Sequence, residues 1–347
     1  MHPVWLVLLL LIAVSACGAE EPNTRAEFRK LVTPPAGVEL SQEVHPLSEI
    51  PGMGAVPGLR CEKVYFTSVP GERVAMLVVR PTGETPRRRP AVLTLHGTRG
   101  SKEGMTPWLC ELARHGFVAC ATDARWHGEL AKADYEEAII TAYRTGKGHP
   151  WLYETVTDTI RALDYLQSRA DVDGDRLGLM GISMGGMNTW LTAAADPRVK
   201  VAVPCIGVTS FAYQLESGRF RARTDTLPKF HQAVAAALGE PEVNARVVRE
   251  AWSKVLPGIL DRFDCPQMLT AIAPRPLLIL NGEKDERCPL EGVQKCYAAA
   301  EGAYKSQNAE ERLKLDVAAN TGHAVTPAQR DLALHWFERW LGSSGKQ

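Results

Sequence analysis

One serine in this chain has the sequence surroundings of an activated nucleophile. Residues 181–186 read Gly-Ile-Ser-Met-Gly-Gly, so Ser183 stands at the centre of a G-x-S-x-G motif. The apolar run 176–180 before it predicts a buried strand, and residues 187–195 after it predict a helix. A strand-to-helix turn this tight favours glycine beside the serine, because those positions have no room for a side chain. The hydroxyl would then project beside the first N–H groups of the helix, which can stabilise an oxyanion.

A serine hydroxyl is a weak nucleophile at neutral pH, so this chemistry also needs a base and an acid that orients the base. Asp285 is the candidate acid, since it follows the apolar run 276–280 and can reach the carboxyl end of that strand. Glu283 and Glu286 are rival carboxylates in the same loop. His323 is the candidate base, because it lies in a glycine-containing loop between the last predicted strand and a closing amphipathic helix.

Two backbone N–H groups are candidates for binding the oxyanion. One belongs to Met184, which directly follows the nucleophile. The other belongs to Thr98, in the His-Gly-Thr-Arg-Gly segment at the end of the predicted strand 90–96. We interpret His96 as a structural residue packed beneath this loop, so that His323 remains the candidate base.

The order of the predicted elements indicates the fold class. Residues 61–67 and 73–80 alternate in polarity around a Val-Pro-Gly-Glu turn, which is typical of a hairpin. Later strands alternate with helices, so we expect an α/β fold with a doubly wound, mostly parallel sheet and the hairpin at its N-terminal edge. Residues 208–272 carry helical patterns without a strand. We interpret them as a helical cap inserted after the sixth strand; the alternative is a peripheral excursion.

Composition and spacing exclude several classes of function. The 347 residues carry 40 basic and 40 acidic side chains, and this balance gives no electrostatic basis for binding nucleic acid. The sequence has no C-x-x-C pair or His/Cys spacing that would indicate a metal site. Of the eight cysteines, several fall in apolar runs that are typical of core positions. Export would allow a disulfide, and Cys288 with Cys296 or Cys265 is then the pair to test.

Residues 1–17 have the pattern of a targeting segment. The apolar stretch 4–14 is too short to span a bilayer, and it ends in small residues as a signal peptide does. The sequence Val-Ser-Ala-Cys-Gly that follows resembles a bacterial lipobox, so Cys17 is the predicted lipidation site. Plain signal-peptidase cleavage nearby is the alternative. We expect export from a bacterial cell, with lipid at Cys17 as the only membrane contact. Residues 18–58 are predicted to form a tether to a domain at 59–347.

These residues together resemble the α/β-hydrolase superfamily, whose nucleophile, acid and base follow one another in the order found here. Segments 96–104, 123–129 and 273–285 are similar to its dienelactone hydrolase-like and acetyl xylan esterase-like branch. The resemblance extends from about residue 60 to the C-terminus. It implies the roles given above for the candidate residues, and it implies no metal or organic cofactor.

The resemblance also implies a reaction. True dienelactone hydrolases carry a cysteine nucleophile, so Ser183 departs from them and favours hydrolysis of carboxylic esters through an acyl-enzyme. The partner would be a small-molecule or carbohydrate ester, with Arg99 and His127 as candidate contacts at the mouth of the site. A stand-alone peptidase of the prolyl-oligopeptidase type is one alternative. A non-catalytic, surface-anchored binding protein built on a hydrolase fold is another.

Overall fold

A computed structural model describes residues 24–83 and 88–342, which contain one nine-stranded sheet in the order β1-β2-β3-β5-β4-β6-β7-β8-β9. Strands β1, β2 and β3 are antiparallel to their neighbours, whereas β5, β4, β6, β7, β8 and β9 run parallel to one another. This order confirms the predicted mostly parallel sheet with a hairpin, β2–β3, toward one edge. The strand bounds are β1 Glu43–Leu47, β2 Leu59–Val69, β3 Glu72–Pro81, β4 Arg89–Leu95, β5 Val118–Thr122, β6 Val172–Ile182, β7 Val199–Cys205, β8 Leu277–Gly282 and β9 Leu313–Ala318.

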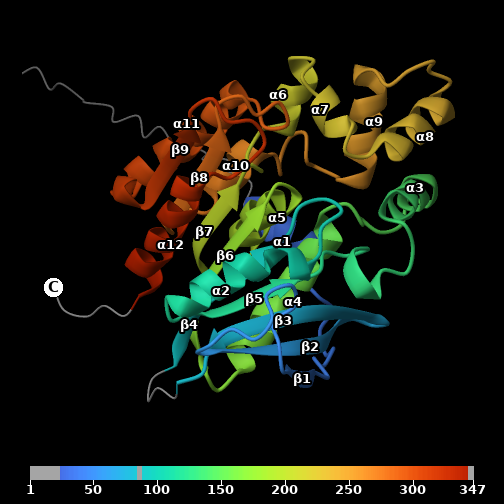
Figure 1. Ribbon diagram of the computed structural model, residues 1–347. Helices are drawn as coiled ribbons and strands as arrows, with labels where there is room; N and C mark the ends of the chain where they lie inside the picture. The colour runs from blue at the N-terminus through green and yellow to red at the C-terminus, as the bar shows by residue number, and fades with distance from the viewer. Residues whose placement is uncertain (1–23, 84–87, 343–347) are drawn as a thin grey trace, which may run out of the picture.

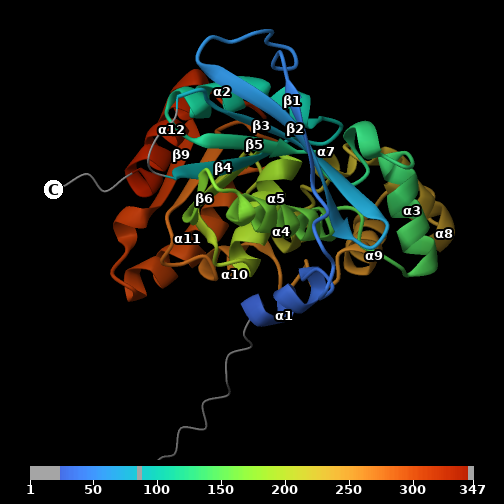
Figure 2. The same ribbon diagram turned by 90° about the horizontal axis from the view of Figure 1, so that it is seen from below.

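Helices cover both faces of the sheet, as Figures 1 and 2 show. Helices α2 and α12 bury Leu109 and Phe337 against one face, and α4 and α5 bury Leu163 and Trp190 against the other. Strands β5 and β8 are buried along their whole length, as expected for apolar strands covered on both sides. The helices outside residues 208–272 are α1 Thr24–Val32, α2 Thr106–Arg114, α3 Tyr135–Thr145, α4 Tyr153–Ser168, α5 Met184–Ala195, α11 Leu290–Ser306 and α12 Pro327–Leu341, with short 3-10 turns at Lys102–Met105, Gly128–Leu130 and Glu310–Arg312.

Part of the predicted tether is packed onto the domain, which corrects the prediction for residues 18–58. Helix α1 buries Phe28 and Val32 in the core, and β1 pairs with β2. The hydroxyl of Thr157 on α4 donates to the Val32 carbonyl at 3.0 Å. The tether prediction rests on the high content of Pro, Gly and acidic residues. Composition of this kind does not reveal that a nine-residue helix in the segment buries two apolar side chains.

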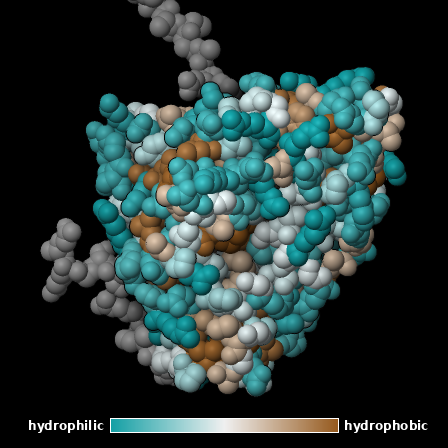
Figure 3. Space-filling model, turned by 45° about the horizontal axis from the view of Figure 1, so that its top comes forward, coloured by the Kyte–Doolittle hydropathy of each residue, from teal (hydrophilic) through white to brown (hydrophobic). Residues whose placement is uncertain are grey.

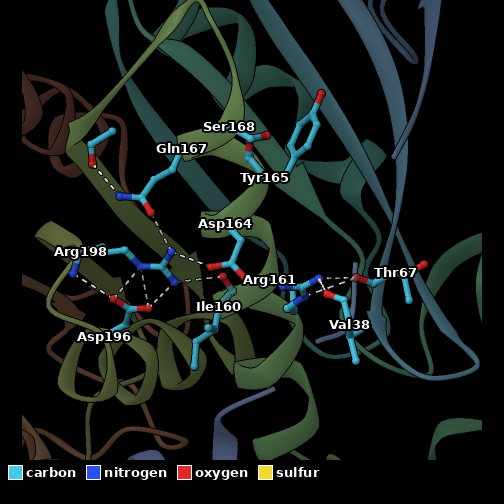
Figure 4. A network of polar contacts seen from close by, with 11 residues as sticks. Val38, Thr67, Ile160, Arg161, Asp164, Tyr165, Gln167, Ser168, Asp196 and Arg198 are labelled. Carbon is cyan, nitrogen blue, oxygen red and sulfur yellow. Dashed lines mark hydrogen bonds and ion pairs between the residues drawn. The ribbon is translucent and has the colours of Figure 1, made fainter. Parts of the chain in front are cut away.

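A polar network fixes α4 against two other parts of the domain (Figure 4). The Asp164 carboxylate accepts from Arg161 and from Arg198, each at 2.6 Å. Arg161 also donates to the Val38 carbonyl at 2.7 Å, and Arg198 pairs with Asp196 just before β7. These half-buried ion pairs hold α4, the N-terminal segment and the start of β7 together.

Residues 208–272, all of which the structure describes, contain five helices and no strand. In Figure 1, α6 to α9 lie together at the top of the molecule, whereas α10 lies near the sheet against α5 and α11. The inserted helices therefore divide into an outer group and one helix of the central layers. Their bounds are α6 Phe211–Glu216, α7 Arg221–Thr224, α8 Pro228–Leu238, α9 Ala245–Val255 and α10 Cys265–Thr270.

The seven cysteines among the described residues are all buried free thiols. The Cys288 thiol donates to the Ile206 carbonyl at 3.3 Å instead of pairing with Cys296 or Cys265. None of the three cysteines considered for a disulfide, Cys265, Cys288 and Cys296, is therefore bridged in the structure. These side chains pack as small apolar residues in the core.

The predicted signal segment 1–17, with Cys17, lies outside the described residues. Among the helices that the structure does describe, none combines the length and apolar content needed to cross a membrane.

Candidate active site

Ser183 occupies a sharp turn between β6 and α5, with φ 56° and ψ −112°. This is a strained backbone conformation for a serine, and such strain persists only where the surroundings enforce it. The Ser183 N–H donates to the Cys205 carbonyl at 2.9 Å, which ties the turn to β7. A Cβ atom at Gly181 would lie 2.2 Å from the Gly185 carbonyl oxygen, and one at Gly185 would lie 2.2 Å from the Leu95 carbonyl oxygen. Both positions therefore exclude any residue larger than glycine.

The structure brings the three predicted side chains into one hydrogen-bonded chain. His323 Nε2 lies 2.8 Å from Ser183 Oγ, and His323 Nδ1 lies 2.8 Å from Asp285 Oδ2. Ser183 follows β6, Asp285 follows β8 and His323 follows β9. The carboxyl ends of these strands share one edge of the sheet. The other carboxylate oxygen of Asp285 accepts the N–H groups of Arg287 and Cys288 at 2.9 and 3.0 Å. With Nδ1–H donated to the carboxylate, Nε2 is left to accept the serine proton.

The rival carboxylates of the same loop lie away from His323. Asp285 is buried, whereas Glu283 and Glu286 are exposed. Glu283 accepts the Asn320 N–H at 2.7 Å, so it serves to join the loops after β8 and β9.

The loop after β4 rests on His96. His96 Nδ1 lies 2.8 Å from the Gly97 carbonyl oxygen, and Nε2 accepts the Ala124 N–H at 2.9 Å. Burial lowers the pKa of His96, which keeps the ring neutral and able to make both contacts. The turn itself closes through the Gly100 N–H, which donates to the Gly97 carbonyl at 2.9 Å. His96 thus has the structural position expected from the sequence.

The two N–H groups predicted to bind an oxyanion lie near the serine. Thr98 lines the same pocket as Ser183, and Met184 is the first residue of α5. Within the described residues, neither N–H donates to another backbone or side-chain acceptor. Both N–H groups are therefore without a protein acceptor in the described part of the chain, as expected of donors kept for an oxyanion.

The two predicted mouth residues lie elsewhere. Arg99 donates to Glu136 at 2.9 Å and does not line the pocket. His127 is buried, with Nδ1 3.0 Å from the Arg125 carbonyl oxygen and its ring centroid 4.3 Å from that of Tyr135. Burial lowers the pKa of His127 to about 4, so the ring is a neutral core group at physiological pH. The structure therefore contradicts a substrate contact by His127.

The pocket at Ser183 is small, and the outer helices and neighbouring loops complete it. Arg223 and Thr226 come from the 208–272 insertion, and Met187 lies one turn after Ser183 on α5. Sequence reasoning missed these residues because no motif marks them. A pocket lining shared by α5, α7 and several loops leaves no local spacing signal. The full lining is Thr98, Trp151, Ser183, Met187, Ile206, Gly207, Arg223, Thr226, Arg287, Cys288 and His323.

A separate, larger hollow of about 820 Å³ is lined by residues from α7, from the loop after β8 and from the start of α11. Residues 283–286 and 289–291 form one wall of it, and Arg219, Arg221 and Ala222 form another. Ser183 and His323 do not line this hollow. Any chemistry at Ser183 would therefore take place in the smaller pocket.

One group of side chains near the serine has the composition of a metal site. Asp285, Cys288 and His323 place potential ligand atoms within 4.8 Å of one another. The carboxylate and the imidazole are already bonded to each other, however, and burial raises the pKa of the Cys288 thiol. A buried thiol with a raised pKa resists forming the thiolate that a metal needs. We assign no metal to this group.

Comparison with known proteins identifies the family and the fold of the chain. The dienelactone hydrolase family matches residues 74–240. The putative hydrolase YtaP of Bacillus subtilis is 32% identical over 231 residues, which cover 67% of each chain. The putative esterase YitV of the same organism is 27% identical over 259 residues, or 74% of this chain and 91% of its own. The solved structure of acetyl xylan esterase 1 from a Thermoanaerobacterium species superposes with a TM-score of 0.69 at 19% identity, covering 92% and 94% of the two chains.

The solved structure shows the same α/β-hydrolase fold, and the family match spans the strand and turn that carry Ser183. The similarity to YtaP extends the relationship over two thirds of both chains. The chain is therefore a hydrolase of the α/β-hydrolase fold and belongs to the dienelactone hydrolase family.

Proposed function

We propose that this hydrolase cleaves carboxylic esters with Ser183 as its nucleophile. The observation that carries the proposal is the hydrogen-bonded chain from Asp285 through His323 to Ser183, with both contacts at 2.8 Å. The strained turn at Ser183 and the glycines around it support the same role. The esterase names of YitV and the acetyl xylan esterase favour an ester over other acyl substrates.

The geometry supports a two-step reaction. His323 removes the proton from Ser183 as Oγ attacks the ester carbonyl, and Asp285 holds the imidazole in the tautomer that accepts at Nε2. The N–H groups of Met184 and Thr98 stabilise the negative oxygen of the tetrahedral intermediate. The intermediate collapses as His323 gives its proton to the leaving alcohol, which forms an acyl-enzyme. Water, activated by His323, then releases the acid and restores Ser183.

Covalent labelling tests the nucleophile. A fluorophosphonate should add one label per wild-type molecule in an intact-mass measurement, and Ser183→Ala should take up none. We expect the same substitution to lower kcat for a short-chain ester by about 10⁵-fold or more, because the members of such a chain act as a unit. A folded wild type that takes up no label would contradict the proposal and favour a binding protein.

Paired substrates separate an esterase from a peptidase. Acyl esters and aminoacyl amides with the same leaving chromophore should be turned over at very different rates, with the esters preferred. A preference for the amides would replace the esterase proposal with a peptidase. The proposed substrate is a small-molecule or carbohydrate ester, because the pocket at Ser183 is small and the esterase relatives include an acetyl xylan esterase.

We also propose that the enzyme is exported and anchored by lipid at Cys17. The support is the lipobox-like end of the apolar segment 4–14. Expressed in a bacterial host, the wild type should sediment with membranes and incorporate labelled palmitate. Cys17→Ser should do neither, and it should keep its esterase activity. A wild type that is soluble and unlabelled would contradict the anchor.

A further inference from the structure

Arg223 is a buried cation beside the nucleophile. Its side chain is 5% exposed, and it lines the pocket together with Ser183 and His323. It lies on α7, in the insertion, and the reaction described above does not use it. Among the residues that the structure describes, no carboxylate forms an ion pair with its guanidinium.

Neutral groups hold this guanidinium in place. Its Nε donates to Gln214, its Nη1 contacts the Met187 sulfur, and its Cζ lies over the Phe211 ring, 4.3 Å from the ring centroid. Gln214 is itself fully buried and donates to the Arg287 carbonyl at 2.9 Å. The second terminal nitrogen, Nη2, has no acceptor within the described part of the chain. The guanidinium is therefore oriented but not neutralised.

The acidic groups nearest to Arg223 form hydrogen bonds with other partners. Asp285 is bonded to His323, and Asp264 accepts the Ser210 hydroxyl and the Phe211 N–H. A guanidinium removed from water without a counter-ion is destabilising, and burial accordingly lowers the pKa of Arg223. A negative group in the pocket would supply the missing counter-ion.

The surroundings add a second positive charge and no broad apolar surface. Arg287 also lines the pocket, is exposed and makes no side-chain ion pair within the described residues. Figure 3 brings forward the top of Figure 1, where α6 to α9 lie, and shows a mostly hydrophilic surface with hydrophobic side chains in small separate patches. Such a surface suits a small polar ligand better than a long acyl chain.

We propose that the ester cleaved at Ser183 carries a carboxylate, which binds the Arg223 guanidinium. The proposal rests on the esterase function proposed above and narrows its substrate class. The substrates would be half-esters of dicarboxylic acids or O-acyl derivatives of hydroxy acids. A planar carboxylate matches the donor geometry of a guanidinium and is held by charge-assisted hydrogen bonds.

Matched substrates test the proposal. Monomethyl glutarate is compared with its neutral primary amide, and O-acetyl-lactate with O-acetyl-lactamide, so that both the acyl and the alcohol side are sampled. In the wild type, kcat/KM should favour the carboxylate in at least one pair by about 10- to 100-fold. A ratio near one, or below one, in both pairs would overturn the proposal.

Substitution identifies the residue. Arg223→Gln should bring the carboxylate-to-amide ratio close to one. Arg246→Gln makes the same change at an exposed position on α9 of the same insertion, and it should keep the wild-type ratio. If Arg223→Gln does not fold, Arg223→Lys replaces it and should reduce the ratio, because lysine lacks the planar fork. An unchanged ratio in the folded Arg223 variant would refute the assignment.

A binding measurement separates this proposal from the esterase proposal. Ser183→Ala should bind monomethyl glutarate at least tenfold more tightly than the amide in calorimetry, and the difference should vanish when Arg223 is also replaced. If the fluorophosphonate labels Ser183 but carboxylates gain no advantage, the esterase proposal stands and the carboxylate proposal fails. If no label is taken up but Arg223-dependent binding persists, the esterase proposal fails, and Arg223 binds a carboxylate that the protein does not cleave at Ser183.

Discussion

The two walls of the pocket at Ser183 are built in different ways. Ser183, Asp285 and His323 follow β6, β8 and β9, so the hydrogen bonds of the sheet set the distances between them. Arg223, on the opposite wall, depends on the packing of α6, α8 and α9 against neighbouring loops. That packing is aromatic, with ring contacts among Trp151, Phe211, Phe230 and Trp252.

The two kinds of construction suit different roles in the pocket. Backbone hydrogen bonds give positions that side-chain changes elsewhere do not easily disturb, which suits the reacting groups. Packing between inserted helices can change without breaking the sheet, which suits the choice of substrate. Substitutions in the sheet wall, formed by Ser183, Asp285 and His323, should therefore lower turnover of every substrate. Substitutions in the inserted wall, formed by Arg223 and the helices α6 to α9 that hold it, should change stability, KM or selectivity.

The largest effect is expected at the turn itself. A Cβ in Gly185→Ala would lie 2.2 Å from the Leu95 carbonyl oxygen, so either the turn or β4 must move. A displacement of about 1 Å between reacting groups lowers the rate by about 100-fold, and we expect at least that loss in kcat/KM for all esters. The rate of fluorophosphonate labelling should fall in parallel, because it reports the nucleophile alone.

A second glycine provides the control for this prediction. Gly302, in the interior of α11, leaves open space within 4 Å of the point where an alanine Cβ would lie. Gly302→Ala should keep full activity and raise stability by about 0.5–1 kcal/mol, since alanine is the better helix former. If Gly185→Ala were as active as Gly302→Ala, the sheet wall would be far more tolerant than its geometry indicates.

The same contrast explains what could be predicted from the sequence. Ser183, Asp285 and His323 were predictable because each follows a predicted strand, and parallel strands end at one edge. Arg223 was not, since a four-residue helix inside an insertion is placed by contacts with residues distant in sequence. His127 was misplaced for a related reason: its position in a loop after β5 does not show that the ring packs on Tyr135.

The inserted wall should also respond to pH. His231 on α8 is fully buried, where Nε2 accepts the Trp252 indole N–H at 3.1 Å. Burial lowers its pKa to about 4 from an ordinary value of 6.5. The unfolded chain therefore binds a proton between pH 6.5 and 4 that the folded chain does not bind. Stability from this group is complete above about pH 6.5 and declines by about 3 kcal/mol as the pH falls to 4.

Urea unfolding at pH 7, 5.5 and 4 measures this effect. Other groups also contribute to the wild-type decline, so the informative quantity is its difference from His231→Gln, which cannot titrate. The wild type should lose stability more steeply than the variant across this range. His335→Gln, at an exposed position on α12, should follow the wild type. Parallel curves for wild type and His231→Gln would show that the imidazole is not held neutral.

The smallest effect is expected where the two walls meet. Glu136 on α3 accepts from Arg99 in the loop after β4 at 2.9 Å and from the Phe230 N–H on α8 at 3.1 Å. Glu136→Gln keeps the size of the side chain, but its amide has a single oxygen acceptor for these two donors. Because Arg99 is mostly exposed, the loss should come chiefly from the buried N–H, at about 1–2 kcal/mol of stability. KM should rise a few-fold with little change in kcat.

Glu137→Gln, at the exposed neighbouring position, should change neither quantity. A fall in kcat equal to the rise in KM would mean that this contact positions the Thr98 N–H as well, and the two walls would then be less independent than their construction indicates.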